Sequence, residues 1–295
     1  MHDMSSISPT DSIRIHALET GTVAIKELQR NSRGRDKSSL LRVFAARRWT
    51  DPLPILAWLI EHPEGLIVVD TGETSRVSEP GYFPRWHPYY RLALREWVTG
   101  EDEIGPQIRR LGFSPDDVRW VVLTHFHTDH AGGLAHFPNS EILSSRVDFE
   151  FSRGVRGRAR GFLPQHWPQW FSPTLIEPRR RPFGPFPAST ALTAAGDVHL
   201  LPTPGHTPGH LSVALEAGDI VFFLAGDVSY TEQLMLHGVV DGVTPDPAAA
   251  RATLRRVQQL VSDRPTVYLP THDPAAVARL TQRQVVSPSS VGLPA

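Results

Sequence analysis

A cluster of three histidines and one aspartate directly after a short apolar run constrains this chain more than any other feature. Residues 120–123 (Trp-Val-Val-Leu) favour a buried strand, and the chain continues as Thr-His-Phe-His-Thr-Asp-His over residues 124–130. Ala131-Gly132-Gly133 then predicts a tight turn into a helix. The cluster is therefore expected on the loop after a strand's carboxyl end, where α/β folds expose their chemistry.

The spacing within the cluster favours a metal site. His125 and His127 are two residues apart on an extended segment, so both imidazoles can face one point. Asp129 and His130 follow where the chain turns, and can face a second point nearby. Neutral imidazole and carboxylate are the ligands of zinc and similar metals. A polar loop with scattered histidines is the alternative, but this density of ligand types favours a metal cage.

Three later segments repeat one pattern, in which an apolar strand ends in a small residue, proline or glycine and then a ligand type. Residues 200–202 precede a Pro/Gly turn that carries His206, residues 220–226 end on Asp227, and residues 266–270 lead to His272. A single loop histidine would be weak evidence, and the shared context is what makes these three residues candidates.

Together these positions resemble the metallo-β-lactamase superfamily of metallohydrolases, which is recognised by an H-x-H-x-D-H motif and then His, Asp and His on later strand ends. The matching positions in this chain are His125, His127, Asp129, His130, His206, Asp227 and His272. The resemblance implies a mixed α/β fold, an αβ/βα four-layer sandwich of two mixed β-sheets flanked by helices. The site is then expected along one edge of the two sheets.

The resemblance also implies two divalent metal ions, with zinc expected and iron, cobalt or manganese as alternatives. In the family pattern His125, His127 and His206 hold one ion. Asp129, His130 and His272 hold the other, and Asp227 bridges the two. An aspartate such as Asp70, in the Asp-Thr-Gly at residues 70–72, usually supports a ligand in this family, although it could be a plain turn residue. His210 is interpreted as structural or as a support for the ligands.

The composition of the chain limits the classes of binding partner that we expect. The 30 basic and 31 acidic residues give a formal charge of −1, which does not favour a nucleic-acid partner. The sequence has no cysteine, no apolar run of membrane-spanning length and no secretory signal at its start. We therefore expect a cytoplasmic protein that binds no nucleic acid and no membrane.

The chain divides into a flexible N-terminal segment (1–11), one folded domain (12–284) and a flexible tail (285–295). Within the domain the patterns predict strands at 13–23, 41–45, 54–60 and 66–72, and helices at 89–98, 103–111 and 246–262.

Two aromatic-rich segments are candidate walls of a substrate pocket. The first, residues 81–90, would be a lid, a homodimer surface or both, and the alternative is simple packing onto the sandwich. The second lies within the irregular segment 149–187. The candidate substrate-binding residues from both segments are Tyr82, Phe83, Trp86, Phe162 and Trp167.

Tyr230, three residues after Asp227, resembles the tyrosine by which lactonases of N-acyl homoserine lactones contact the substrate carbonyl. The predicted function is thus opening of that lactone ring, which is quorum quenching. Tyr230 would bind substrate and stabilise the oxyanion, and Asp129 would carry a proton to the leaving alkoxide. The alternatives are a glyoxalase-II-like thioesterase, another esterase or phosphodiesterase of this fold, and a non-catalytic protein with structural metals.

Overall fold

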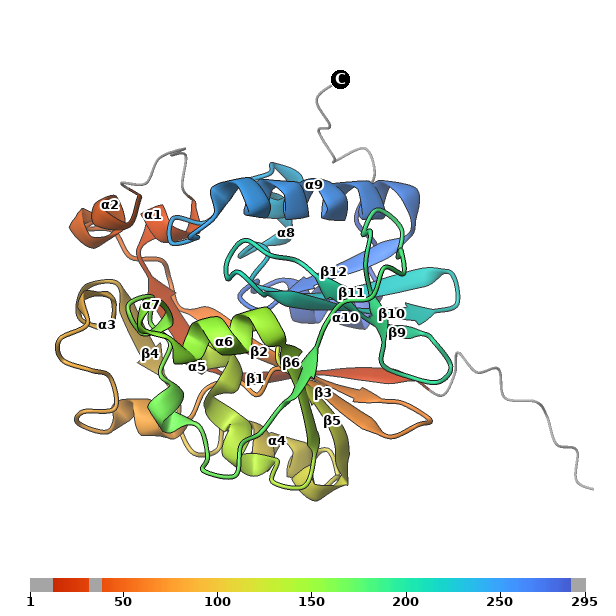
Figure 1. Ribbon diagram of the computed structural model, residues 1–295, viewed down its shortest axis with the longest axis horizontal. Coiled ribbons are helices and arrows are strands. Elements are labelled where there is room, and N and C mark those ends of the chain that lie inside the picture. Colours follow the sequence, from red (N-terminus) through yellow and green to blue (C-terminus); the bar gives the residue numbers. More distant parts are fainter. Residues whose placement is uncertain (1–12, 32–38, 288–295) are drawn as a thin grey trace, which may run out of the picture.

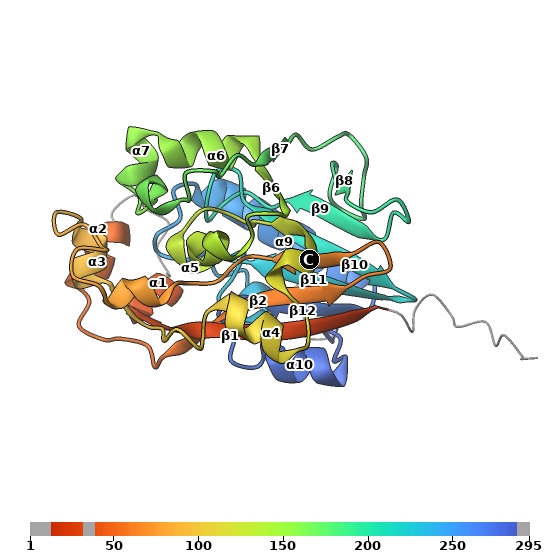
Figure 2. The same cartoon turned by 90° about the horizontal axis from the view of Figure 1, so that it is seen from below.

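Two mixed β-sheets pack face to face, and helices cover the outer face of each sheet (Figures 1 and 2). The computed structural model describes residues 13–31 and 39–287. The predicted four-layer αβ/βα sandwich is therefore confirmed.

The first sheet has seven strands in the order β4-β1-β2-β3-β5-β6-β7. Strands β4, β1, β2 and β3 pair antiparallel, whereas β3, β5, β6 and β7 pair parallel. The bounds of the strands are β1 Arg14–Ile25, β2 Leu53–Glu61, β3 Leu66–Val69, β4 Leu94–Trp97, β5 Val118–Val122, β6 Glu141–Ser145 and β7 Thr174–Ile176.

The second sheet has five strands in the order β12-β11-β10-β9-β8. Only β11 and β12 pair parallel, and the other neighbours are antiparallel. The bounds are β8 Thr190–Ala191, β9 Val198–Pro202, β10 Leu211–Ala217, β11 Ile220–Gly226 and β12 Thr266–Pro270.

The main core lies between the sheets. Alternate side chains of β2, β3 and β5, such as Trp58, Val69 and Val122, meet alternate side chains of the second sheet, such as Val213 and Leu224. The opposite faces of these strands are also apolar, so a strand such as β2 is a continuous hydrophobic run in the sequence. Helices on the outside of the sheet bury this second face.

Helices cover both outer faces. Helix α9 (Pro247–Asp263) packs Leu254, Val257 and Val261 onto the second sheet, while α4 (Ile104–Arg110) packs onto the first. Asp246 caps α9 because its carboxylate accepts from the amides of residues 248 and 249. The helices predicted at 103–111 and 246–262 are confirmed. The remaining helices are α1 Glu27–Arg30, α2 Ser39–Ala45, α3 Pro88–Leu92, α5 Thr128–Ala131, α6 Arg146–Arg153, α7 Val155–Arg158, α8 Glu232–Leu236 and α10 Ala276–Gln282.

Two sequence predictions of secondary structure are wrong. Residues 41–45 belong to helix α2 rather than to a strand, because an apolar run this short does not distinguish the two periods. Residues 89–98 begin as the short helix α3 and then become strand β4, which pairs with β1. Exposure alternates along β4, with Arg95 and Trp97 exposed, as expected of a strand.

Val286, which lies in the tail (285–295) expected to be flexible, is packed onto the core. Val286 is buried against the core under α9, and its amide donates to the carbonyl of Thr266. The expected flexible segment 1–11 and residues 288–295 lie outside the described residues. Within the described chain, no helix combines the length and the apolar character needed to cross a membrane.

Candidate metal centre

The seven predicted ligands come together where strands of both sheets end. His125 and His127 follow β5, and Asp129 and His130 lie on α5. His206 follows β9. Asp227 comes directly after β11, and His272 comes two residues after β12. The site therefore lies along one edge of the sandwich, where the carboxyl ends of these strands meet.

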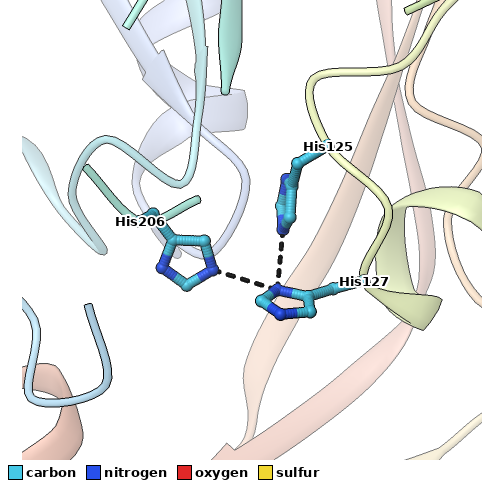
Figure 3. A group of neighbouring side chains, drawn as sticks. All are labelled: His125, His127 and His206. Carbon is cyan, nitrogen blue, oxygen red and sulfur yellow. Dashed lines mark hydrogen bonds between the residues drawn. The ribbon is translucent and has the colours of Figure 1, made fainter. Parts of the chain in front are cut away.

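One group of three imidazoles shares a single point. The Nδ1 atom of His127 lies 2.9 Å from Nε2 of His125 and 3.1 Å from Nε2 of His206. Figure 3 shows the three rings turned toward one another from two separate loops. Their nitrogens can face one cation, and the three side chains form a candidate ligand group.

A second group lies beside the first. Nε2 of His272 is 3.4 Å from Oδ2 of Asp129, and Nε2 of His130 is 3.9 Å from the same oxygen. These three side chains form another candidate ligand group.

Asp227 stands between the two groups. Its Oδ1 atom lies 3.3 Å from Nε2 of His130 and 3.4 Å from Nε2 of His272, while its Oδ2 lies 3.3 Å from Nε2 of His206. Each carboxylate oxygen thus faces a different group, as a bridging ligand requires. Asp227 is placed there by Gly226, whose φ of +56° is in the left-handed region and whose added Cβ would lie 2.8 Å from Nε2 of His210.

Hydrogen bonds to the other ring nitrogen orient three of these histidines. Nδ1 of His130 donates to Asp70 at 2.8 Å, Nδ1 of His206 donates to Asp241 at 3.1 Å, and Nδ1 of His272 donates to the carbonyl of Pro54 at 2.9 Å. Each bond places a proton on Nδ1, which leaves Nε2 as the nitrogen that faces the site.

Asp70 organises the motif as well as supporting one ligand. Its Oδ1 accepts from the Thr124 amide at 2.7 Å, and its Oδ2 accepts from the Thr124 hydroxyl at 2.8 Å. The same hydroxyl accepts from Nδ1 of His125 at 3.0 Å. Asp70 is 1% exposed and has a φ of 60°, which is uncommon for a non-glycine residue. These contacts support the interpretation of Asp70 as a residue that orients ligands.

His210 points its nitrogens away from the ligand groups. Its Nε2 accepts from the amide of Asp227 at 3.1 Å, and its Nδ1 donates to the hydroxyl of Thr203 at 2.8 Å. Both nitrogens are therefore occupied, and His210 fixes the backbone of Asp227.

The buried charges of the site shift the pKa values of its histidines in opposite directions. Burial, together with the like charge of nearby His206, lowers the pKa of His127 to about 3. Burial also opposes the charged form of His272, but Asp227 and Asp129 outweigh it and raise its pKa to about 10. His127 is thus a neutral ligand at physiological pH, whereas a metal that binds at His272 would displace a proton.

The residues fit two divalent cations. Nε2 of His130 and Oδ1 of Asp227 are buried, and within the described chain they have no hydrogen-bond partner. Buried polar atoms of this kind are normally satisfied, so their pairing across a 3.3 Å gap indicates that a cation belongs there. Five imidazoles and two carboxylates are a borderline donor set that suits zinc, iron, cobalt or manganese.

A cavity of about 980 Å³, counting its open mouth, reaches the ligand groups. Tyr230 and Phe162 line it beside Asp129, Asp227 and His272. The ring of Phe162 stacks on His127 at 4.5 Å between centroids. Apolar side chains from β1, α2, β4 and α6 form another part of the wall, with Val23, Ile25, Phe44, Leu94 and Phe151.

Four aromatic residues predicted to bind substrate do not line this cavity, which corrects their expected location. Tyr82 stacks on His166 at 4.1 Å, and Trp167 packs against Phe126 at 4.9 Å; both line a smaller, separate hollow. Phe83 stacks on the ring of Tyr90 from outside, and Trp86 points into solvent with 68% of its surface exposed.

Sequence reasoning missed three polar residues of the cavity wall: Gln29, Tyr89 and Glu96. Nε2 of Gln29 donates to the hydroxyls of both Tyr89 and Tyr230, each at 2.8 Å. No local signal marks Gln29, because it lies on a single helical turn 201 residues before its partner Tyr230. Tyr89 belongs to the aromatic segment 81–90, which the composition did single out.

Comparison with known proteins gives the family and its relatives. Residues 50–272 match the sequence model described as the metallo-beta-lactamase superfamily. The N-acyl homoserine lactonase AiiA of Bacillus thuringiensis subsp. kurstaki is 29% identical over 225 residues, 75% of this chain and 82% of that protein. The probable metallo-hydrolase Rv2300c of Mycobacterium tuberculosis is 34% identical over 201 residues, 66% of this chain and 61% of that protein.

Solved structures agree on the fold. An N-acyl homoserine lactone hydrolase with the product N-hexanoyl-L-homoserine at its catalytic metal centre aligns with a TM-score of 0.68 and 23% identity, covering 88% of this chain and 93% of that one. The dizinc quorum-quenching lactonase AidC aligns with a TM-score of 0.63 and 19% identity, covering 89% and 88%.

Proposed function

Since this chain belongs to the metallo-beta-lactamase superfamily, we propose that it is a dinuclear-metal hydrolase that opens the lactone ring of N-acyl homoserine lactones, and so quenches quorum signals. The coarser class, a metal-dependent hydrolase acting on ester bonds, is the one predicted from the sequence, and its lactonase and metallo-hydrolase relatives confirm it. A cytoplasmic location and a homodimer stay predictions from the sequence.

The observation that carries the proposal is the position of Tyr230 beside Asp227. Its ring lies 5.6 Å from the ring of His272, and Tyr230 is one of the residues that line the cavity. Burial raises the pKa of Tyr230 well above its ordinary value, so the hydroxyl keeps its proton. A protonated hydroxyl next to a metal centre is a ready donor to an ester carbonyl oxygen.

The apolar cavity supports an acylated substrate. Its wall includes valine, leucine, isoleucine and phenylalanine side chains that would enclose a hydrocarbon chain, and the ligand groups with Tyr230 form another part of the same wall. This division matches a molecule with a polar ring at one end and an acyl chain at the other.

Two residues would handle the charges of ring opening. Bound divalent cations would supply Lewis-acid polarisation of the carbonyl and an activated water. Tyr230 would donate to the carbonyl oxygen as negative charge develops there. Asp129 would take up the proton that the attacking water releases and pass it to the departing alkoxide. Burial raises the pKa of Asp129, but His130 and His272 outweigh this and lower it to about 2, so it is an ionised carboxylate able to accept that proton.

An activity panel on metal-loaded protein tests the proposal. The substrates are an N-acyl homoserine lactone, a glutathione thioester and an aryl phosphodiester, each followed with and without a chelator. We expect the lactone to have the highest kcat/KM and the chelator to remove the activity. Turnover of the thioester or the phosphodiester with an inert lactone would overturn the assignment in favour of the thioesterase or phosphodiesterase alternative.

We predict that Gln29→Leu lowers kcat on the lactone roughly ten- to a hundredfold with little change in KM. Gln29 touches no expected ligand, but its amide holds the Tyr230 hydroxyl at 2.8 Å, and small displacements of a reacting group cost rates of this order. Steady-state kinetics measures the effect.

Two further variants separate this role from a loss of packing. Gln29→Glu keeps the shape but cannot donate, so it should not restore the rate. Gln107→Leu removes a surface amide that donates to the backbone of Glu19 and Asp102, and should leave kinetics unchanged. Normal kcat in Gln29→Leu would contradict the prediction.

A further inference from the structure

Three large apolar side chains protrude into solvent around the cavity mouth. Leu41 on α2 is 72% exposed, Trp86 before α3 is 68% exposed, and Val155 on α7 is 86% exposed. We call residues 39–49, 81–92 and 153–161, which carry them, the mouth rim. Side chains of this size and exposure, gathered in one place, usually mark an interaction surface.

The mouth rim lies at one end of the molecule. Figures 1 and 2 both place α2, α3 and α7 together at the same end, away from β9 and β10. The same segments supply inward-facing residues to the cavity, including Phe44, Tyr89 and Gly161. The Nε2 atom of His87 also donates to the carbonyl of Ala159, which joins the second and third segments. The protruding side chains therefore stand on the same segments as Pro88, Ala159 and Arg160, which line the cavity and are exposed to solvent.

The charge of the mouth rim differs from that of the whole chain. Its three segments carry three, two and four arginines respectively, and no lysine, aspartate or glutamate. The chain as a whole has 30 basic and 31 acidic residues. Arg85, Arg91, Arg156 and Arg158 are exposed next to Trp86, Leu92 and Val155. Glu27 on α1 pairs with one of the mouth-rim arginines, Arg48, at 3.9 Å, and the mouth rim as a whole is apolar with an excess of positive charge.

This combination fits a membrane surface better than a second copy of the chain. A two-fold dimer through the mouth rim would set one cluster of arginines against its own copy, which like-charge repulsion disfavours. At an anionic bilayer, in contrast, a tryptophan lies well at the level of the headgroups, aliphatic tips enter the acyl boundary, and guanidinium groups pair with phosphates.

We propose that the mouth rim docks this protein on the surface of an anionic phospholipid bilayer, with the cavity entrance facing the lipid. This revises the expectation from composition that no membrane takes part, because the net charge of −1 conceals the local excess of arginine. Docking would present the entrance to acylated molecules dissolved in the bilayer. That consequence rests on the proposed function, whereas the docking does not.

Vesicle flotation of the purified full chain tests the proposal. The vesicles contain phosphatidylcholine alone, or phosphatidylcholine with about a third phosphatidylglycerol. We expect binding to the anionic vesicles only, weakening as salt rises. A variant with Leu41→Ser, Trp86→Ala and Val155→Ser together should bind at least about tenfold more weakly, because it loses its apolar contacts. A second variant, which combines Arg85→Gln, Arg156→Gln and Arg158→Gln, should bind the anionic vesicles roughly fivefold more weakly for each arginine removed.

Matched controls separate docking from general stickiness and misfolding. Trp170→Ala with Val277→Ser removes two apolar side chains of 43% and 41% exposure outside the mouth rim, and should bind normally. Melting temperatures should stay close to that of the parent chain in all variants, since every altered side chain is exposed.

Absence of binding to anionic vesicles would overturn the proposal, and so would unchanged binding of the variant with Leu41→Ser, Trp86→Ala and Val155→Ser. A third contrary outcome is a dimer in light scattering that this variant abolishes, in a chain that does not bind vesicles. The assay contains no lactone and needs no turnover. An enzyme inert to lactones that still floats with vesicles would refute only the proposed function.

Discussion

Asp227→Asn should bind both metal ions more than about a hundredfold more weakly, and its turnover should fall at least about a thousandfold. Removing a supporting residue outside the ligand sphere already costs ten- to a hundredfold in metal affinity, and Asp227 touches both ligand groups directly. Its two oxygens lie 3.3–3.4 Å from His130, His272 and His206. An amide supplies one oxygen and no charge, so it cannot hold two cations together.

Elemental analysis after loading and dialysis measures this effect. The parent chain should retain two ions, and the variant fewer than one. Asp219→Asn is the matched control, because Asp219 is an exposed turn residue between β10 and β11 and should behave as the parent. Two retained ions together with ordinary activity in Asp227→Asn would show that Asp227 is not the bridge.

The ligand set could be predicted because each of its members lies in a recognisable local sequence pattern. His125, His127, Asp129 and His130 fall within six residues, and each later candidate follows an apolar strand. Strands of a sandwich end at common edges, so ligands placed at strand ends must meet. The supporting contacts were partly visible too, since Asp70 follows a buried strand in the same way as the ligands do.

The cavity could not be predicted in the same detail, because its walls depend on which side of each segment turns inward. The aromatic segment 81–90 contributes Tyr89 and Tyr90 to the cavity, yet neighbouring Trp86 faces solvent and Tyr82 stacks on His166 elsewhere. A loop with no regular period gives no rule for these directions. The role of Gln29 is even harder to predict from the sequence, because its hydrogen bond to Tyr230 joins two segments that no local pattern relates.

Tyr230→Phe should lower kcat on an N-acyl homoserine lactone roughly ten- to a thousandfold, the range for losing one oxyanion donor that a metal partly replaces. KM should change less than kcat, because the hydrogen bond strengthens only as charge develops on the carbonyl oxygen. Metal content should stay at the parent value, since the Tyr230 hydroxyl bonds to Gln29 and to none of the seven candidate ligands within the described residues.

The structure supplies a second, independent readout and a matched control for this variant. Loss of the Tyr230 hydroxyl would leave the Gln29 amide with the Tyr89 hydroxyl as its only described side-chain acceptor, which should cost about 1–3 kcal/mol of stability for a buried unpaired donor. Tyr268→Phe removes another buried hydroxyl, bonded to Ser229 at 2.9 Å and away from the cavity wall, so it should lose stability and keep its kcat. A loss of kcat in Tyr230→Phe that Tyr268→Phe does not share assigns the hydroxyl to the reaction. Equal kinetics in the two variants would leave Tyr230 a packing residue and remove the main support for a lactonase.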